Sequence, residues 1–259
     1  SHYQQMAQRI RAHFGLKNVI VTESESNQDL SKQSVAKAGA EHLLSILKDN
    51  SIIGIAWGST ISAMLGFLPP QSITGCSVWQ LTAGLPSQAL ELDGHELTKR
   101  FASKLNASWH ILNAPFIVQN KLLKNLLIHE PEIADHFSIF EKMDIALVGL
   151  GSSDPAKSMT YRGKYITLEE SKQLVASGCA ADLCGHRILM DATPAQTFLS
   201  DRVISIDLAT LKKIPYVIAV AAGEDKALSI IAASRGQYIK TLIIDEMAAI
   251  SIIKKEKIV

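Results

Sequence analysis

Short apolar runs alternate with segments of helical periodicity along most of the chain. The runs show no regular polar alternation, whereas the segments between them repeat apolar residues every three or four positions, as amphipathic helices do. Strands are predicted at 17–23, 51–57, 76–83, 109–115, 144–151, 215–223 and 238–245. Helices are predicted at 6–14, 28–48, 59–68, 95–105, 120–128, 225–236 and 246–254.

Strands that are apolar throughout have no polar face to show to water. They therefore predict a mostly parallel sheet with helices on both faces, a Rossmann-like α/β fold whose connections are right-handed crossovers. The least regular part, about 151–202, is expected to form a small subdomain or lid beside the main sheet. Ligands of such sheets bind beyond the carboxyl ends of the strands, so the loops that follow strands are the candidate site.

The first of these loops is "WGST", which ends one predicted strand and begins a helix at Ser59. Gly58 allows close backbone approach to a ligand, and the helix offers free N–H groups and the positive end of its dipole. With the hydroxyls of Ser59 and Thr60, this loop could hold a phosphate or carboxylate. The alternative is that Ser59 or Thr60 only caps the helix.

A second loop of the same design is "AAGEDKAL", where Gly223 again follows a strand and precedes a helix. Lys226 falls in the first turn of this helix, where a cation is unfavourable for the helix dipole. A bound anion between the lysine and the helix end would explain it. The alternative is an exposed lysine paired with Glu224 or Asp225.

Two further positions are ambiguous from the sequence. The strand-end turn at 149–153, which contains Gly151, could admit a ligand or simply reverse the chain. Asp182 is a single carboxylate among small apolar neighbours. It could accept hydrogen bonds from the hydroxyls of a polyol, or it could cap a turn.

Composition excludes several classes of protein. Of 259 residues, 47% are hydrophobic and 20% charged, and the formal net charge is +1, so no overall field attracts the chain to nucleic acid or an anionic membrane. Cys76, Cys179 and Cys184 form no CxxC motif, which fits a reducing compartment and a cytoplasmic location. No apolar run approaches the ~20 residues of a membrane span.

Sequence signatures of catalysis are absent. The chain has no HExxH or Cys/His metal spacing, no GxSxG elbow, no Walker GK[ST] and no GxGxxG after a strand. His42, His129 and His186 are interpreted as structural, and the cysteines as inert thiols. The sequence therefore predicts a binder of a small anion, without cofactor or metal, rather than an enzyme.

The same loops, in this order, carry a resemblance to a known family. The stretches "FGLKNVIV", "IGIAWGSTISAM", "VWQLTAGL", "LNAPFIV", "DIALVGLGS", "ADLCGHRI" and the block from Asp201 through Glu246 resemble the effector-binding domain of SorC-type (sorbose-operon) bacterial transcriptional regulators. The resemblance spans the chain from Phe14 to Ala249.

This resemblance implies a sugar-binding domain related in fold to glucosamine-6-phosphate deaminase and ribose-5-phosphate isomerase. The bound sugar or sugar phosphate would modulate operator binding. The ligand-binding residues that it implies are Gly58, Ser59, Thr60, Gln80, Gly84, Gly151, Asp182, Gly223 and Lys226. The family's usual "WGRT" reads "WGST" here, so an unphosphorylated sugar is also compatible with the loop.

The resemblance also implies partners. Regulators of this family carry an N-terminal helix-turn-helix, so 1–15 is interpreted as the remnant of a linker helix, 16–259 as the effector domain, and the chain as a fragment of a longer regulator. Operator DNA would be bound only through the missing part, and the domain would form a homo-oligomer, a dimer or a tetramer. The alternative is a sugar-phosphate isomerase or deaminase, but the Asp-Gly-His expected after Gly149 reads Ser152-Ser153-Asp154-Pro155.

Overall fold

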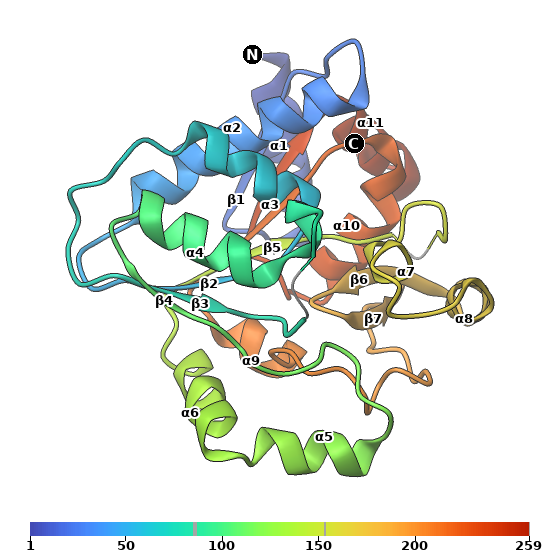
Figure 1. Ribbon diagram of the computed structural model, residues 1–259. Helices are drawn as coiled ribbons and strands as arrows, with labels where there is room; N and C mark the ends of the chain where they lie inside the picture. The colour runs from blue at the N-terminus through green and yellow to red at the C-terminus, as the bar shows by residue number, and fades with distance from the viewer. Residues whose placement is uncertain (85–86, 153, 259) are drawn as a thin grey trace.

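The computed structural model describes residues 1–84, 87–152 and 154–258. Its main feature is a seven-stranded sheet in the order β1-β9-β8-β5-β2-β3-β4, in which every neighbouring pair is parallel (Figure 1). The strands are β1 (Asn18–Thr22), β2 (Ile52–Ile55), β3 (Ser77–Gln80), β4 (Ser108–His110), β5 (Ile145–Gly149), β8 (Tyr216–Ala221) and β9 (Thr241–Asp245). The predicted α/β fold class is confirmed.

Helices cover both faces of the sheet (Figure 1). One layer consists of α2 (Gln28–Ile46), α3 (Ser59–Met64), the short 3₁₀ turns η1 (Leu65–Phe67) and η2 (Leu90–Leu92), and α4 (Gly94–Lys104). The other contains α1 (His2–Phe14), α10 (Ala227–Arg235) and α11 (Glu246–Glu256). The segment 1–15 is part of this second layer, because α1 packs on β1 and α11 and buries Met6, Ile10 and Phe14.

The central strands are buried on both faces, which is why they read as uninterrupted apolar runs. All five residues of β9 and the last five of β8 are buried. The packing leaves no room for a side chain at Gly54 in β2, where an added Cβ would lie 2.5 Å from Leu81 Cδ2. By contrast, the edge strand β4 leaves Trp109 51% exposed.

The irregular region after β5 has structure of its own. It contains α7 (Met159–Arg162), α8 (Leu168–Ala176) and an antiparallel pair, β6 (Cys179–Leu183) and β7 (His186–Leu189). A separate apolar cluster, which includes Phe116 and Leu174, lies beneath it. A two-residue bridge ties it to the end of β5, because Gly151 and Asp182 exchange backbone hydrogen bonds of 2.8 and 3.0 Å.

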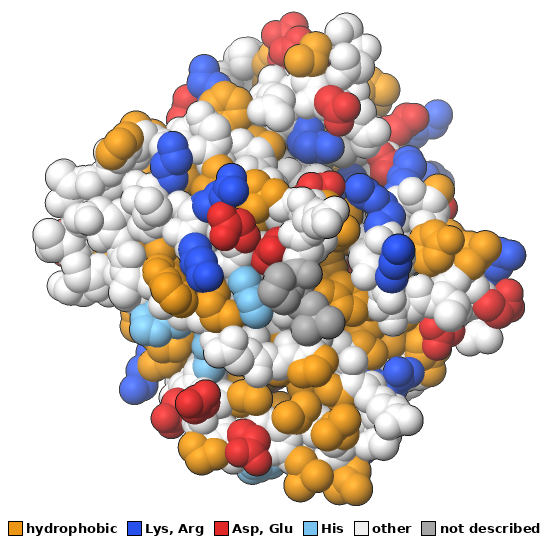
Figure 2. All heavy atoms as spheres, in the orientation of Figure 1, with side chains coloured by type: hydrophobic (Ala, Val, Ile, Leu, Met, Phe, Trp, Pro, Cys, Tyr) orange, Lys and Arg blue, Asp and Glu red, His pale blue; other side chains and the backbone are white. Residues whose placement is uncertain are grey.

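Two more helices lie outside the main layers. α5 (Lys121–Ile128) and α6 (Pro131–Phe140) lie together at the lower end of the molecule in Figure 1, and Figure 2 shows hydrophobic side chains gathered over that end. α6 and the short helix α9 (Leu208–Lys213) were not predicted, although Pro131 at the start of α6 is a helix-start signal. No helix in the described ranges is long and apolar enough to span a membrane.

Some predicted boundaries of strands and helices were wrong, because contacts made in the folded chain decide where these elements begin and end. The strand predicted at 109–115 ends at His110, because the Leu112 N–H bonds to the side-chain Oε1 of Gln80 (3.1 Å) instead of continuing the sheet. The helix predicted at 59–68 changes to the 3₁₀ turn η1 at Leu65. The helix predicted at 225–236 begins as another 3₁₀ turn, η3 (Glu224–Lys226).

Candidate functional site

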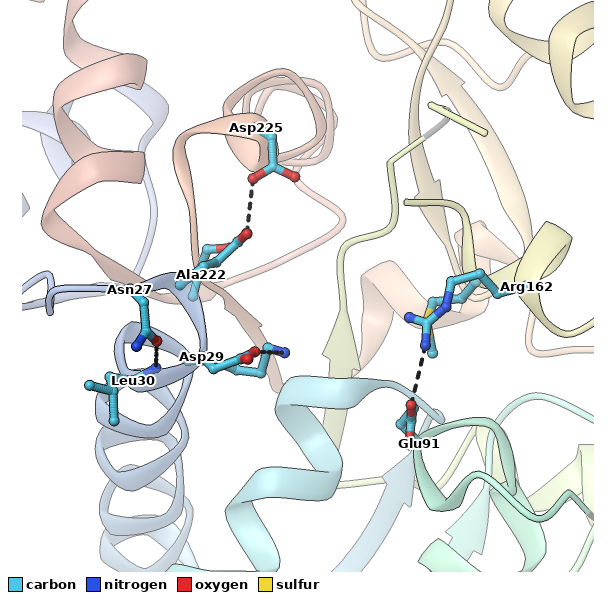
Figure 3. Close-up of polar contacts among 10 residues, drawn as sticks. Asn27, Asp29, Leu30, Glu91, Arg162, Ala222 and Asp225 are labelled. Atoms are coloured by element: carbon cyan, nitrogen blue, oxygen red, sulfur yellow. Dashed lines mark hydrogen bonds and ion pairs between the residues drawn. The ribbon is translucent and has the colours of Figure 1, made fainter. Parts of the chain in front are cut away.

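A cavity of about 310 Å³ lies at the carboxyl ends of β2, β5 and β8. Its lining comes from the loops after these strands, from the start of α2, from the segment around α7 and from the turn between β6 and β7. Figure 3 shows Asp29 and Asp225 on one side, with Arg162 and Glu91 across from them. This is the place where open α/β sheets bind ligands.

The "WGST" loop lines the cavity with Gly58, Ser59 and Thr60. The N-cap of α3 is Gly58, which makes no side-chain cap, so the prediction that Ser59 or Thr60 caps this helix was wrong. Neither hydroxyl has a hydrogen-bond partner within the described chain. Because the first turn of α3 also lacks a side-chain acceptor, its N–H groups and these two hydroxyls are available to an anion.

Lys226 lines the same cavity from η3, just before α10. The described residues give its ammonium neither a hydrogen bond nor an ion pair. Asp225, the adjacent acid, is engaged elsewhere: it pairs with Lys157 Nζ (3.1 Å) and accepts a hydrogen bond from Gln28 Nε2 (3.1 Å). Burial lowers the pKa of Lys226, and the charge of Asp225 opposes that shift.

Asp182 lines the cavity but is also part of a buried network. Its Oδ1 accepts a hydrogen bond from the Gly185 N–H (2.9 Å), and its Oδ2 accepts one from the Thr160 hydroxyl (3.0 Å) and pairs with Arg187. Arg187 is only 4% exposed and donates through Nη2 to Thr160 Oγ1 (3.1 Å). Asp182 thus does cap a turn, as the alternative interpretation had it, and it also borders the cavity.

Gly151 is another predicted site residue that lines the cavity. It lines the cavity beside Asp182, and a Cβ at this position would lie 2.9 Å from Asp182 Cβ. Because the bridge holds the two backbones in place, neither Cβ can move away easily. A side chain at 151 would therefore displace the carboxylate from the cavity wall.

Three predicted residues do not line the cavity. Gln80 is fully buried: its Nε2 donates to the Thr82 carbonyl (2.8 Å) and its Oε1 accepts from the Leu112 N–H. Thr82 lines the cavity in its place. Gly84 lies near Tyr165, because a Cβ added at Gly84 would lie 3.1 Å from the Tyr165 Oη. Leu85 of the same loop lies outside the described residues, as does Ser153.

Gly223 also lies beside the cavity rather than in its lining. Its φ of 104° falls in the left-handed region that favours glycine, and its N–H donates to Asp245 Oδ1 (2.8 Å). An added Cβ would lie 2.4 Å from Gln28 Nε2. Gly223 therefore shapes the turn that carries Lys226 into the cavity.

Sequence reasoning missed several lining residues. Gln28, Asp29 and Lys32 come from the start of α2, after β1, and the strand-end rule that selected the other loops would have selected this one too. Lys157 and Arg162 come from the irregular region, where no periodicity signals their direction. Arg162 pairs with Glu91 of η2 (3.4 Å), and Lys32 with Asp29 (3.2 Å).

His186 and Cys184 lie in surroundings that favour a structural role over a chemical one. His186 Nε2 bonds to the Ile206 carbonyl (2.8 Å), and burial lowers the pKa of its imidazole. Burial raises the pKa of the Cys184 thiol to about 12, so this thiol is unreactive although it borders the cavity. Within the described residues, no group of three or more His, Cys, Asp or Glu side chains could hold a metal ion.

Comparison with known proteins gives consistent results. Residues 1–254 match the family Sugar-bind, whose description is "Putative sugar-binding domain". The chain is 29% identical over 252 residues to the sorbitol operon regulator of Klebsiella pneumoniae, with 96% of this chain and 80% of the relative covered. It is 26% identical over 215 residues to the deoxyribonucleoside regulator of Bacillus subtilis, with 83% and 68% covered.

A solved structure extends this similarity to the fold. The full-length sorbitol operon regulator SorC from Klebsiella pneumoniae has a TM-score of 0.90 at 26% identity, with 98% of this chain and 82% of that chain covered. The relatives are regulators and not enzymes, so the isomerase or deaminase alternative is not favoured. The chain belongs to the Sugar-bind family, the sugar-binding domains of SorC-type transcriptional regulators.

Proposed function

We propose that this chain is the effector-binding domain of a regulator of a carbohydrate-use operon, and that its effector is a sugar or sugar phosphate bound in the cavity at the ends of β2, β5 and β8. One observation carries the proposal. Among the described residues, neither the Lys226 ammonium nor the hydroxyls of Ser59 and Thr60 have a hydrogen-bond partner, and all three groups belong to residues that line one cavity. Its volume of about 310 Å³ suits a small ligand.

In this proposal the anionic end of the ligand binds the "WGST" loop. The N–H groups at the start of α3 donate to it, and Lys226 supplies the opposite charge. The hydroxyl groups of the sugar bind toward Asp182, since its Oδ1 accepts a single hydrogen bond in the network, from the Gly185 N–H, and can accept another. Gln80, Gly84 and Gly223 act as supports of the lining.

The bound effector would act through the region 151–202, proposed as a lid. Two ion pairs join its first segment to other parts of the chain: Lys157 pairs with Asp225 of the lining, and Arg162 pairs with Glu91 of η2. A ligand that binds more tightly to one arrangement of this segment shifts the population toward it by that difference in affinity. Operator DNA would respond through a separate N-terminal domain in a cytoplasmic homo-oligomer. The segment 1–15 would be the linker helix, packed on the effector domain of 16–259 through its contacts with β1 and α11.

A thermal-shift screen tests the proposal. The probes are pentoses, hexoses, polyols and their monophosphates at millimolar concentration. A ligand at a hundredfold excess over its Kd stabilises the folded state by about 2.7 kcal/mol, which for a domain of this size raises the Tm by about 5 °C or more. Larger shifts with the phosphates than with the free sugars would support the anion site, and no shift with any probe would overturn the proposal.

A further inference from the structure

Helix α5 is rich in large apolar residues, although none of its residues is buried. Five of its eight residues are leucine or isoleucine, yet none of the eight is buried. Leu122 is 68% exposed, Leu126 60% and Leu123 39%. These three side chains form the exposed face of α5, and Figure 2 shows hydrophobic side chains over the part of the surface where Figure 1 places α5.

The chain itself gives α5 little support. Helices of this length are marginal in water without tertiary packing. Here Asn120 caps the helix by accepting a hydrogen bond from the Leu123 N–H (2.9 Å), and Leu127 packs partly onto the small cluster beneath α6. The exposed face has no covering element within the described residues. Contiguous exposed apolar surface of this kind marks an interaction site.

The charges around this face indicate what covers it. Lys121 is at the start of α5, with its side chain 66% exposed. Glu130 and Glu132 follow the end of the helix, exposed and without an ion-pair partner in the described chain. The helix dipole has the same direction, positive at Lys121 and negative toward Glu130. A second α5 in antiparallel orientation would therefore match leucine to leucine and lysine to glutamate.

We propose that the exposed face of α5 is the contact between two copies of this chain, packed antiparallel about a two-fold axis. In such an isologous contact each residue meets its counterpart in both directions, so Lys121 of each copy faces Glu130 of the other. The inference rests on the proposed function only in expecting a homo-oligomer. Its test measures mass and not ligand binding, so effector binding in the cavity and the α5 contact can each fail without the other.

The first experiment compares Leu126→Glu with the wild type by sedimentation equilibrium at tens of micromolar. The wild type is expected as a dimer or a larger even assembly, and Leu126→Glu should reduce the mass at least to the next smaller species. The matched control is Val175→Glu on α8, a residue 46% exposed elsewhere on the surface. An unchanged mass for Leu126→Glu, or a monomeric wild type, overturns the proposal.

The second experiment isolates the antiparallel arrangement. Lys121→Glu and Glu130→Lys should each weaken the dimer, because each variant places like charges opposite each other. An equimolar mixture of the two variants should recover the dimer, because both contacts then pair glutamate with lysine. Lys121 also pairs with Asp201 (3.4 Å), but this contact is identical alone and in the mixture. Failure of the mixture to associate overturns the arrangement.

Discussion

Lys157 and Asp225 form an ion pair at the cavity wall, with Nζ and Oδ2 3.1 Å apart. This contact, together with the hydrogen bond from Gln28, engages the acid that lies next to Lys226 in the chain. Asp225 is therefore paired with Lys157, and within the described residues Lys226 makes no direct ion pair with this sequence neighbour. The ammonium of Lys226 is therefore available to bind an anionic ligand in the cavity.

The first prediction concerns this lysine. Lys226→Ala should weaken binding of a phosphorylated effector by roughly ten- to a hundredfold, because it removes a charge-assisted hydrogen bond worth about 1.5–3 kcal/mol. Isothermal titration calorimetry with the best ligand of the thermal-shift screen measures this loss. The control is Lys254→Ala, which removes an exposed lysine from α11. Equal losses in both variants would mean that Lys226 acts only through overall charge.

The second prediction tests whether Gln80 stabilises the fold or contacts the ligand. Gln80→Ala should destabilise the domain by about 1–3 kcal/mol, since it leaves the Leu112 N–H and the Thr82 carbonyl without partners in the interior. Urea unfolding measures this loss. The affinity of the remaining folded protein should change much less than in Lys226→Ala. A large loss of affinity with unchanged stability would make Gln80 a direct ligand contact.

The third prediction concerns the buried pair of Asp182 and Arg187. Arg187→Met should destabilise the domain by up to about 3–5 kcal/mol, because it leaves the Asp182 carboxylate, whose side chain is only 13% exposed, without its counter-charge. Adding Asp182→Asn should recover part of this loss, since the neutral amide needs no counter-charge. A double-mutant cycle by urea unfolding tests the coupling. Strict additivity of the two substitutions would show that the pair is not coupled.

The fourth prediction is a dependence of stability on pH. Burial lowers the pKa of His136 to about 4, and its hydrogen bond to the Gln80 carbonyl (2.8 Å) acts in the opposite direction. The unfolded chain binds this proton near the ordinary value of 6.5. The folded state is therefore fully stable above about pH 6.5 and loses stability as the pH falls toward about 4, by roughly 3 kcal/mol from this residue.

Replacing the imidazole tests this assignment. His136→Gln retains a donor for the Gln80 carbonyl but cannot bind a proton, so its stability should fall less steeply between pH 6.5 and 4. Chemical unfolding at a series of pH values measures the slope. The control is His129→Gln, an exposed position. If the variant and the wild type have the same slope, His136 is protonated in the folded state as easily as in the unfolded chain.

The fold class and a part of the cavity lining follow from the amino-acid sequence alone. The signals used were local: apolar periodicity, helix caps and a glycine at the end of a strand. They were enough to select the "WGST" loop and Lys226 as candidates for an anion site without knowledge of any tertiary contact. Because parallel strands end at one edge of the sheet, residues after different strands were expected to meet there. The residues that do line one cavity are Gly58, Ser59, Thr60, Gly151, Asp182 and Lys226.

Which loops meet, and which side chains are already engaged, depends on the folded chain. The order that places β2, β5 and β8 side by side arises from packing between distant segments, which leaves no local periodicity to read. For the same reason the sequence could not show that Gln80 turns toward Leu112, or that Arg187 of β7 reaches Asp182 of β6. A side chain's type is local, whereas its partner is set by the neighbours that the fold brings to it.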